Sequence, residues 1–294
     1  MLKTRGSDRA VCAIVACLFL VFVATVADAA SPGVEVKFFL DPSEVLDASD
    51  RPSDDLRATF NVATDHQVPP IKMSMQFLES VDHDLNREGW NIRFRKTQRK
   101  DKVEITFKRR IALSGPDSAL IESAIDGVVV AEYRAFEAEL EVGYATQTLT
   151  FSYDKRSNDE EEESLDLPKI AMAREVTGSK MPDKLLQWKH PLWATSIVAE
   201  ACLYGPVVGT RWNGKYAAIS DDISLEVWTV PTEDDRTSTE RIVEISFKEP
   251  EYNEQAILKR EKLKSLLDEK GWLRTNDVLK TKLILERYHP AECR

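Results

Sequence analysis

A strict alternation of apolar and polar residues recurs along the chain and limits the folds open to it. It begins in the stretch GVEVKFFLD, where Val34, Val36 and Phe38 point to one side of a strand. Glu35 and Lys37 point to the other side. Few of the segments with this alternation are followed by a helical crossover, which favours an α+β protein with an antiparallel sheet. The predicted strands are 34–40, 74–79, 90–96, 103–109, 133–142, 147–153, 197–203, 208–212, 224–230 and 241–248.

Helical patterns are fewer. The clearest covers residues 253–270, where Asn253 is suited to cap the N-terminus and Gly271 to end the helix. Its apolar side consists of Ile257, Leu258, Leu263, Leu266 and Leu267. A shorter helix is predicted at residues 117–125.

Two polar segments that contain proline interrupt the strand pattern. They cover about residues 47–72 and 155–196, and the second begins with the acidic block RSNDEEEES, which is typical of a solvated loop. We expect a single domain over residues 30–294, with both segments as irregular insertions.

The N-terminus has the pattern of a secretory signal peptide. A basic start and an apolar run over residues 10–26 precede Ala27-Asp28-Ala29, a small-x-small cleavage pattern. Cleavage after residues 1–29 predicts a secreted protein that is free of the membrane, and the alternative is an uncleaved anchor. Cys202 and Cys293 remain after cleavage, and the sequence leaves open whether they form a disulfide.

Charge and motifs exclude several classes of function. The net charge of -10 argues against a general nucleic-acid binder. The chain has neither a His-Glu-x-x-His zinc site nor a Gly-x-Ser-x-Gly nucleophile elbow. The stretch GTRWNGK has the spacing of a phosphate-binding P-loop, but Tyr216 replaces the required Ser or Thr and the flanking sequence is strand-like.

The polar faces of the strands carry charges that are segregated strand by strand. Solvated faces show the same alternation but usually mix charges with Thr, Ser, Asn and Gln. If helices cover the apolar faces, the charged faces line a closed eight-stranded barrel, which is wide enough for a small ligand. Arg and Lys bind phosphate oxygens, and Mg²⁺ binds carboxylates, so such an interior suits a polyanion with divalent metal ions.

The order of these charged strands resembles the CYTH family of triphosphate tunnel metalloenzymes. VEVKF resembles the family's first strand, NIRFRK its Arg-x-Arg strand and VEITFK the strand that ends in Lys. EYRAFEAELEV, GTRW, LEVW and VEISFK follow in the family's order. The resemblance implies an α+β fold with an antiparallel eight-stranded closed β-barrel, or tunnel, and helices packed outside.

The resemblance also implies a function and a set of site residues. It implies a divalent-metal-dependent phosphohydrolase acting on tripolyphosphate or on nucleoside or organic triphosphates, a small-molecule polyanion. Lys37, Arg93 and Arg95 would be catalytic. The substrate would be bound by Lys37, Arg93, Arg95, Lys108, Arg134 and Arg211. Mg²⁺ or Mn²⁺ would be held by Glu35, Glu137, Glu139, Glu226 and Glu244.

Two departures from the family pattern keep other functions open. Gly33 and Ser246 stand where the family has glutamates, so the basic half of the tunnel is better preserved than the acidic half. The alternatives are a non-catalytic protein that binds a phosphorylated or acidic ligand, and a secreted interaction protein that uses its outer surface. A nucleotide cyclase fits a secreted protein least well.

Overall fold

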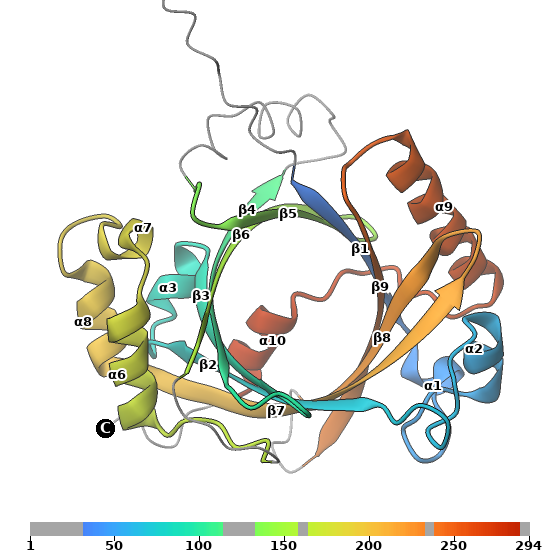
Figure 1. Ribbon diagram of the computed structural model, residues 1–294, viewed down its shortest axis with the longest axis horizontal. Helices are drawn as coiled ribbons and strands as arrows, with labels where there is room; N and C mark the ends of the chain where they lie inside the picture. Colours follow the sequence, from blue (N-terminus) through green and yellow to red (C-terminus); the bar gives the residue numbers. More distant parts are fainter. Residues whose placement is uncertain (1–31, 114–132, 158–163, 233–237, 289–294) are drawn as a thin grey trace, which may run out of the picture.

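The strands of the protein close into one barrel (Figure 1). The computed structural model describes residues 32–113, 133–157, 164–232 and 238–288. Within them the order around the barrel is β1-β5-β6-β4-β3-β2-β7-β8-β9. The strands are β1 (Gly33–Leu40), β2 (Ile71–Glu79), β3 (Trp90–Thr97), β4 (Glu104–Leu113), β5 (Glu137–Val142), β6 (Gln147–Arg156), β7 (Cys202–Tyr216), β8 (Ser220–Pro231) and β9 (Thr239–Glu249).

The predicted eight-stranded antiparallel barrel is corrected to a barrel of nine described strands with mixed pairing. β1 runs parallel to β5, and every other described neighbour is antiparallel. Directions can alternate all the way around a closed ring only if the number of strands is even. A ring of nine strands therefore needs at least one parallel pair. Here that pair is β1 with β5, whereas β1 is antiparallel to its other neighbour, β9.

The segment around residue 197 forms a helix, although a strand was predicted at 197–203. Helix α8 (Trp193–Glu200) covers the first part of this predicted strand, and β7 begins at Cys202. The single strand β7 contains both the predicted strand 208–212 and the stretch GTRWNGK. Ala194 and Val198, four residues apart, are the buried positions of α8. The predicted strand starts at Ile197 and leaves out Ala194, so it misses this helical spacing.

Helices cover the barrel on two opposite sides (Figure 1). One side has α6 (Ile170–Lys180), α7 (Asp183–Leu186), α8 and the short α3 (Asp84–Arg87), so the predicted irregular insertion at 155–196 contains helices. The other side has α1 (Pro42–Val45), α2 (Asp54–Thr59) and α9 (Glu254–Glu269). The apolar strand faces pack against these helices in two separate cores. This cover turns the charged strand faces toward the inside.

Helix α9 confirms the prediction at residues 253–270. The Asn253 side chain accepts a hydrogen bond from the Ala256 backbone N–H at 3.0 Å, and Gly271 takes a positive φ of 70° just after the helix. Leu263 and Leu267 are buried, whereas Ile257 and Leu258 are exposed. The buried side of α9 is thus narrower than its apolar sequence pattern indicates.

Helix α10 (Lys280–Arg287) lies across one end of the barrel, where it is seen through the opening in Figure 1. The sequence analysis did not predict this helix. Its Ile284 and Leu285 join a third apolar cluster with Met73, Met75 and Phe77, which are the inward side chains of β2. This end of the barrel is therefore packed with apolar side chains.

Several predictions concern residues outside the described parts of the chain. They are the signal peptide at 1–29, the helix at 117–125 and Cys293. Cys202 is disulfide-bonded. Within the described residues, no helix is long and apolar enough to cross a membrane.

Candidate functional site

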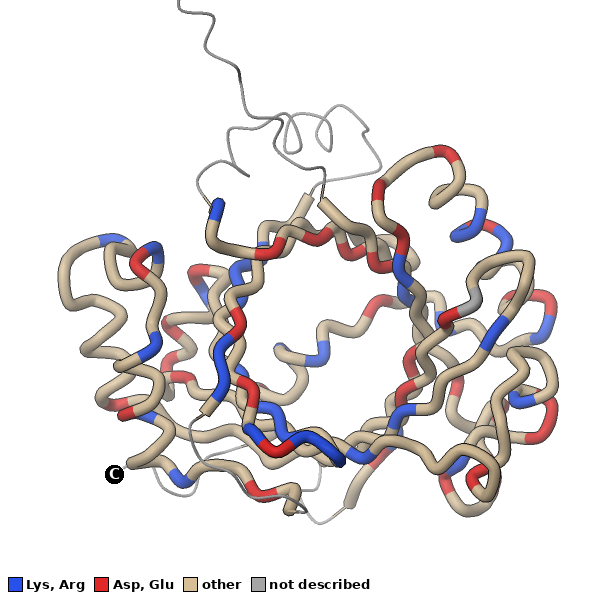
Figure 2. Tube along the Cα trace, in the orientation of Figure 1, with Lys and Arg blue, Asp and Glu red and all other residues tan. Residues whose placement is uncertain are grey.

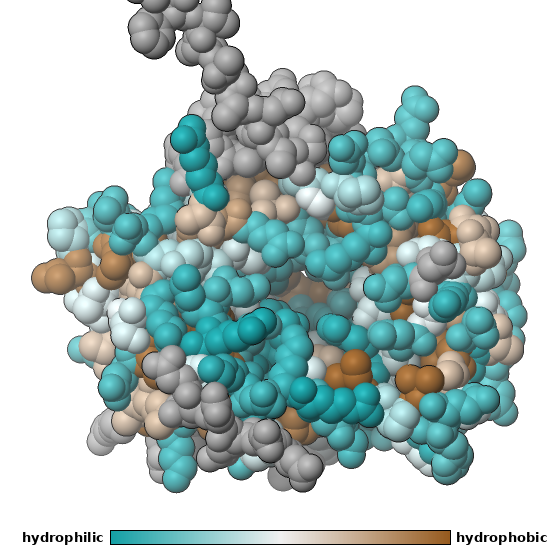
Figure 3. Space-filling view, viewed as in Figure 1, coloured by the Kyte–Doolittle hydropathy of each residue, from teal (hydrophilic) through white to brown (hydrophobic). Residues whose placement is uncertain are grey.

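A cavity of about 400 Å³ lies inside the barrel. Figure 3 shows the hollow at the centre of this face, with hydrophilic side chains around its rim. Acidic positions gather on the wall formed by β1 and β5, and basic positions on the wall formed by β3 and β4 (Figure 2). Among the residues that line the cavity, Lys and Arg outnumber Asp and Glu by seven to five. The interior is thus basic, although the chain as a whole has a net charge of -10.

The basic wall is built from alternate residues of β3 and β4. Arg93 and Arg95 point inward from β3, and Lys108 and Arg110 point inward from β4. Arg93 Nη2 donates to Thr106 Oγ1 at 3.1 Å and lies 3.6 Å from a Glu104 carboxylate oxygen. Arg95 forms an ion pair with the same carboxylate.

Part of the hydrogen-bonding capacity of this wall is unused. The Nε atoms of Arg93, Arg95 and Arg110 are buried and have no hydrogen-bond partner among the described residues. Burial, together with the charges of Arg95 and Arg110, lowers the pKa of Arg93 to about 10. Buried guanidinium donors without partners are costly, and an anion in the cavity would satisfy them.

A cluster of three carboxylates faces this wall. The parallel pairing of β1 with β5 places Glu35 beside Glu141, and Gly33 beside Glu139. One oxygen from each of Glu35, Glu139 and Glu141 lies within 4.8 Å of the others. Three carboxylates at this spacing form a donor set that suits a hard divalent cation.

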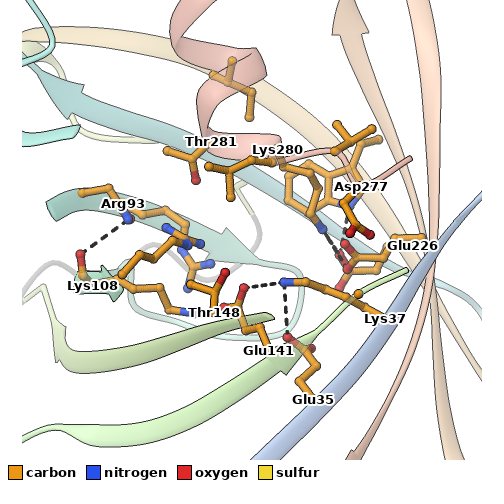
Figure 4. Close-up of a pocket in the computed structure, with 18 of the residues that line it drawn as sticks. Glu35, Lys37, Arg93, Lys108, Glu141, Thr148, Glu226, Asp277, Lys280 and Thr281 are labelled. Carbon is orange, nitrogen blue, oxygen red and sulfur yellow. Dashed lines mark hydrogen bonds and ion pairs between the residues drawn. The ribbon is translucent and has the colours of Figure 1, made fainter. Parts of the chain in front are cut away.

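Glu141 lies at the centre of the ion pairs in the tunnel (Figure 4). Its two carboxylate oxygens accept from Lys37 Nζ at 2.5 Å and from Lys108 Nζ at 2.7 Å. Burial would raise the pKa of Glu141, but these two ammonium groups hold it well below its usual range. Burial tends to lower both lysine pKa values. The pKa of Lys37 nevertheless rises because Glu141, Glu35 and Glu244 surround it. The pKa of Lys108 falls because its burial, together with the charges of Arg110 and Arg93, outweighs the attraction of Glu141.

A second pair of carboxylates, Glu226 and Glu244, lies at the side of the tunnel nearest α10. Arg211 donates to Glu226 Oε1 at 2.8 Å through Nε, and Lys280 lies between the two carboxylates. Burial would raise the pKa of Glu226, but Lys280 and Arg211 lower it to about 2. The pKa of Glu244 is raised, first by its burial, because Lys280 and Lys37 only partly offset burial and the charge of Glu226.

Most of the predicted site residues meet in the cavity. They are Glu35, Lys37, Arg93, Arg95, Lys108, Arg211, Glu226 and Glu244. Glu139 lies at the edge of the carboxylate cluster, where it accepts from Lys248 Nζ at 2.5 Å. Arg134 and Glu137 do not line the cavity. Both are exposed, Arg134 in the turn before β5 and Glu137 at the first position of that strand.

The prediction missed four charged lining residues, Glu141, Arg110, Lys280 and Asp277. The first two continue an alternation already visible in the sequence, Glu141 after Glu139 and Arg110 after Lys108. The predicted strand 133–142 already contains Glu141, whereas the predicted strand 103–109 stops one residue short of Arg110. Lys280 has no such signal, because it belongs to a helix whose place inside the barrel depends on tertiary packing.

The two departures from the family pattern lie on the walls of the tunnel. Gly33 shares the face of Glu35 and Lys37, and a Cβ atom added to it would meet no atom closer than Glu249 O at 3.8 Å. Ser246 is buried and pairs in register with Lys37. Both positions therefore lack a carboxylate close to the cluster.

Comparisons with known proteins find similarity only among solved structures. No protein-family profile matches the chain, and no curated protein matches it in sequence. A candidate adenylyl cyclase from Hippeastrum, described as revealing a dominant triphosphatase activity, is 14% identical with a TM-score of 0.43, and the match covers 85% of this chain and 93% of that one. A candidate adenylate cyclase from Bacillus halodurans is 11% identical with a TM-score of 0.43, covering 85% and 97%. A protein from Pyrococcus horikoshii OT3 is 11% identical with a TM-score of 0.38, covering 85% and 98%.

All three matches have identities of 14% or lower and TM-scores below 0.5. At such low identities and TM-scores, the activities in their descriptions remain those of the proteins compared. The function of this chain has to be derived from its own site.

Proposed function

We propose that this protein is a divalent-metal-dependent phosphohydrolase that acts on tripolyphosphate or on a nucleoside or organic triphosphate held in the tunnel. One observation carries the proposal. A single cavity brings guanidinium groups with unused donors together with Glu35 and Glu141, which form a carboxylate cluster with Glu139 at its edge. The first group suits phosphate oxygens and the second suits a hard cation, and a metal–polyphosphate complex presents both.

The basic wall would bind and orient the phosphate chain. Arg93 and Arg95 offer planar, bidentate donors on one strand, and Lys108 and Arg110 offer cationic groups on the next. Lys37 projects from the opposite wall toward the carboxylate cluster. Its ammonium group lines the cavity beside the cluster, where it can neutralise charge that develops on a phosphate during attack by water.

The carboxylate cluster fits a divalent cation in its chemistry. Glu35, Glu139 and Glu141 would hold the ion, and Mg²⁺ or Mn²⁺ bound there would polarise phosphate oxygens and lower the pKa of water. The ammonium groups of Lys37 and Lys108 bind Glu141. Phosphate oxygens entering the tunnel can take over these ammonium groups, which would free carboxylate oxygens for the cation.

Release of inorganic phosphate by the purified protein tests this function. We expect hydrolysis of tripolyphosphate or of a nucleoside triphosphate in the presence of Mg²⁺ or Mn²⁺, and its loss on addition of a chelator. The same rate with and without the chelator would contradict the metal-dependent mechanism.

A second candidate, binding without turnover, is favoured by the ion pairs that already occupy Glu141, Glu226 and Glu244. In that case the basic wall holds an anionic ligand, and the carboxylates only neutralise the tunnel. Calorimetric titration with tripolyphosphate distinguishes the two candidates, because tight binding with no phosphate release supports the second.

Gly33 offers a direct test of the carboxylate cluster. The space around it accepts a side chain, and its register partner is Glu139. We expect Gly33→Glu to lower the Kd for Mn²⁺ by about tenfold, because one more carboxylate joins the ligand set. Isothermal titration calorimetry measures this change, and Gly33→Gln is the matched control of similar size without the charge. Equal affinities for the two variants would show that the cluster does not hold the ion.

A further inference from the structure

The ammonium group of Lys280 occupies a three-sided cage inside the tunnel (Figure 4). It donates to Glu226 Oε2 at 3.2 Å and to Glu244 Oε1 at 2.9 Å. It also lies 4.3 Å from the centroid of the Trp228 ring, which is a favourable position for a cation. Lys280 therefore supplies a positive charge to a pair of buried carboxylates.

The helix that carries Lys280 is fixed at both of its ends. Before it, the Asp277 carboxylate accepts from the backbone N–H groups of Tyr144 and Thr146 at 2.7 Å, and from that of Ala145 at 2.8 Å. At its last residue, Arg287 Nη1 donates to Pro231 O at 2.9 Å. The apolar cluster on β2 holds the middle of the helix. The cation thus belongs to a rigid element of the fold.

The cage still has the character of a cation site. Glu226 has further donors in Arg211 and in the Trp228 indole, whose Nε1 donates to Oε2 at 2.9 Å. Glu244 is 5% exposed, and its Oε2 atom is buried with no hydrogen-bond partner among the described residues. Without Lys280, the pair would present at least two buried carboxylate oxygens to any cation in the tunnel.

We propose that Lys280 is a tethered cation that takes the place of a metal ion between Glu226 and Glu244. The pair then binds no divalent ion, although both residues were predicted as metal ligands from the sequence. The cluster of Glu35, Glu139 and Glu141 is then the metal site of the described tunnel. This assignment of the metal site rests on the proposed function. A second metal is dispensable because the ammonium group already neutralises the pair.

Counting bound Mn²⁺ by electron paramagnetic resonance, with no substrate present, tests this inference. We expect Lys280→Met to bind one more Mn²⁺ per chain than the unsubstituted protein. Adding Glu226→Gln to Lys280→Met removes the extra ion. Lys282→Met, which removes an exposed lysine from the same helix, leaves the count unchanged. An identical count for Lys280→Met and the unsubstituted protein overturns the proposal.

A second comparison covers the case in which Lys280→Met does not fold. Glu226→Gln in the otherwise unsubstituted protein must then leave the Mn²⁺ count unchanged, and the loss of one ion overturns the proposal. Because these counts are made without turnover, they are independent of the phosphatase assay. A protein that gives the expected counts but releases no phosphate refutes the proposed function and leaves the tethered cation standing.

Discussion

Replacing Lys37 by alanine is expected to lower the rate of phosphate release from tripolyphosphate by about 100- to 1,000-fold, the usual effect of removing one preorganised donor to a developing charge. Lys37 is the cationic group that reaches from the carboxylate wall toward the centre of the tunnel, 2.5 Å from Glu141 and 3.9 Å from Glu35. Steady-state kinetics at saturating Mg²⁺ measure the effect. The loss should appear in kcat more than in KM, because Arg93, Arg95 and Lys108 remain to bind the substrate.

Lys72→Ala is the matched control for this experiment. Lys72 is an exposed lysine in β2, offset by one from the inward position Met73, and it does not line the tunnel. Its replacement should leave the kinetics unchanged. A Lys37→Ala variant that keeps its thermal unfolding midpoint and also keeps full activity would exclude the tunnel as the place of catalysis.

Replacing Glu141 by alanine is expected to have the largest effect on stability, a loss of about 3–5 kcal/mol in the free energy of unfolding. The substitution leaves the ammonium groups of Lys37 and Lys108 in the tunnel without their shared carboxylate. A buried charge that loses its partner keeps its desolvation penalty and loses the compensating attraction. Urea unfolding followed by tryptophan fluorescence measures the change.

Glu137→Ala provides the comparison on the same strand. Glu137 is exposed at the start of β5, so its replacement should change the free energy of unfolding by no more than about 0.5 kcal/mol. A similar loss for both variants would mean that the ion pairs of Glu141 add nothing to stability. Glu137→Ala should also leave Mn²⁺ binding intact, although the sequence pattern placed this residue among the metal ligands.

The wall of the tunnel could be predicted from the sequence because alternation is a local property. Glu35 and Lys37 must share a face of their strand, and so must Arg93 and Arg95. The charged side chains could be predicted to point inward because the apolar faces of the same strands need helices to cover them. That reasoning placed eight of the predicted site residues in one cavity.

The ring closure could not be predicted because it depends on which strands pair. The parallel joint of β1 and β5 decides that Glu141, and not Glu137, lies next to Glu35. A shift of two residues along β5 keeps the same face but changes which glutamate meets the cluster. The resemblance to the family favoured Glu137 and Glu139, and only the register corrects this choice.

Helical segments were missed where their signals were short. Helix α9 has a cap at each end and was found, whereas α6, α7 and α8 lack a side-chain hydrogen bond at the N-cap. Helix α10 likewise has no such cap. It is fixed instead by contacts with segments that are distant in the sequence. Asp277 binds the loop between β5 and β6, Lys280 binds Glu244 on β9, and Arg287 binds Pro231 at the end of β8. This is the helix that brings Lys280 into the tunnel, so the missed helix and the missed site residue have the same cause.

The most direct test of the account is the release of inorganic phosphate from tripolyphosphate by the purified protein, with Mg²⁺ and with a chelator, for the unsubstituted chain and for Arg93→Ala. The account predicts release that depends on the metal ion and is strongly reduced by Arg93→Ala, because Arg93 lines the cavity and its guanidinium keeps a donor without a partner among the described residues. Release that is insensitive both to the chelator and to Arg93→Ala, or the absence of any release with Mg²⁺ or Mn²⁺, would contradict hydrolysis in the tunnel.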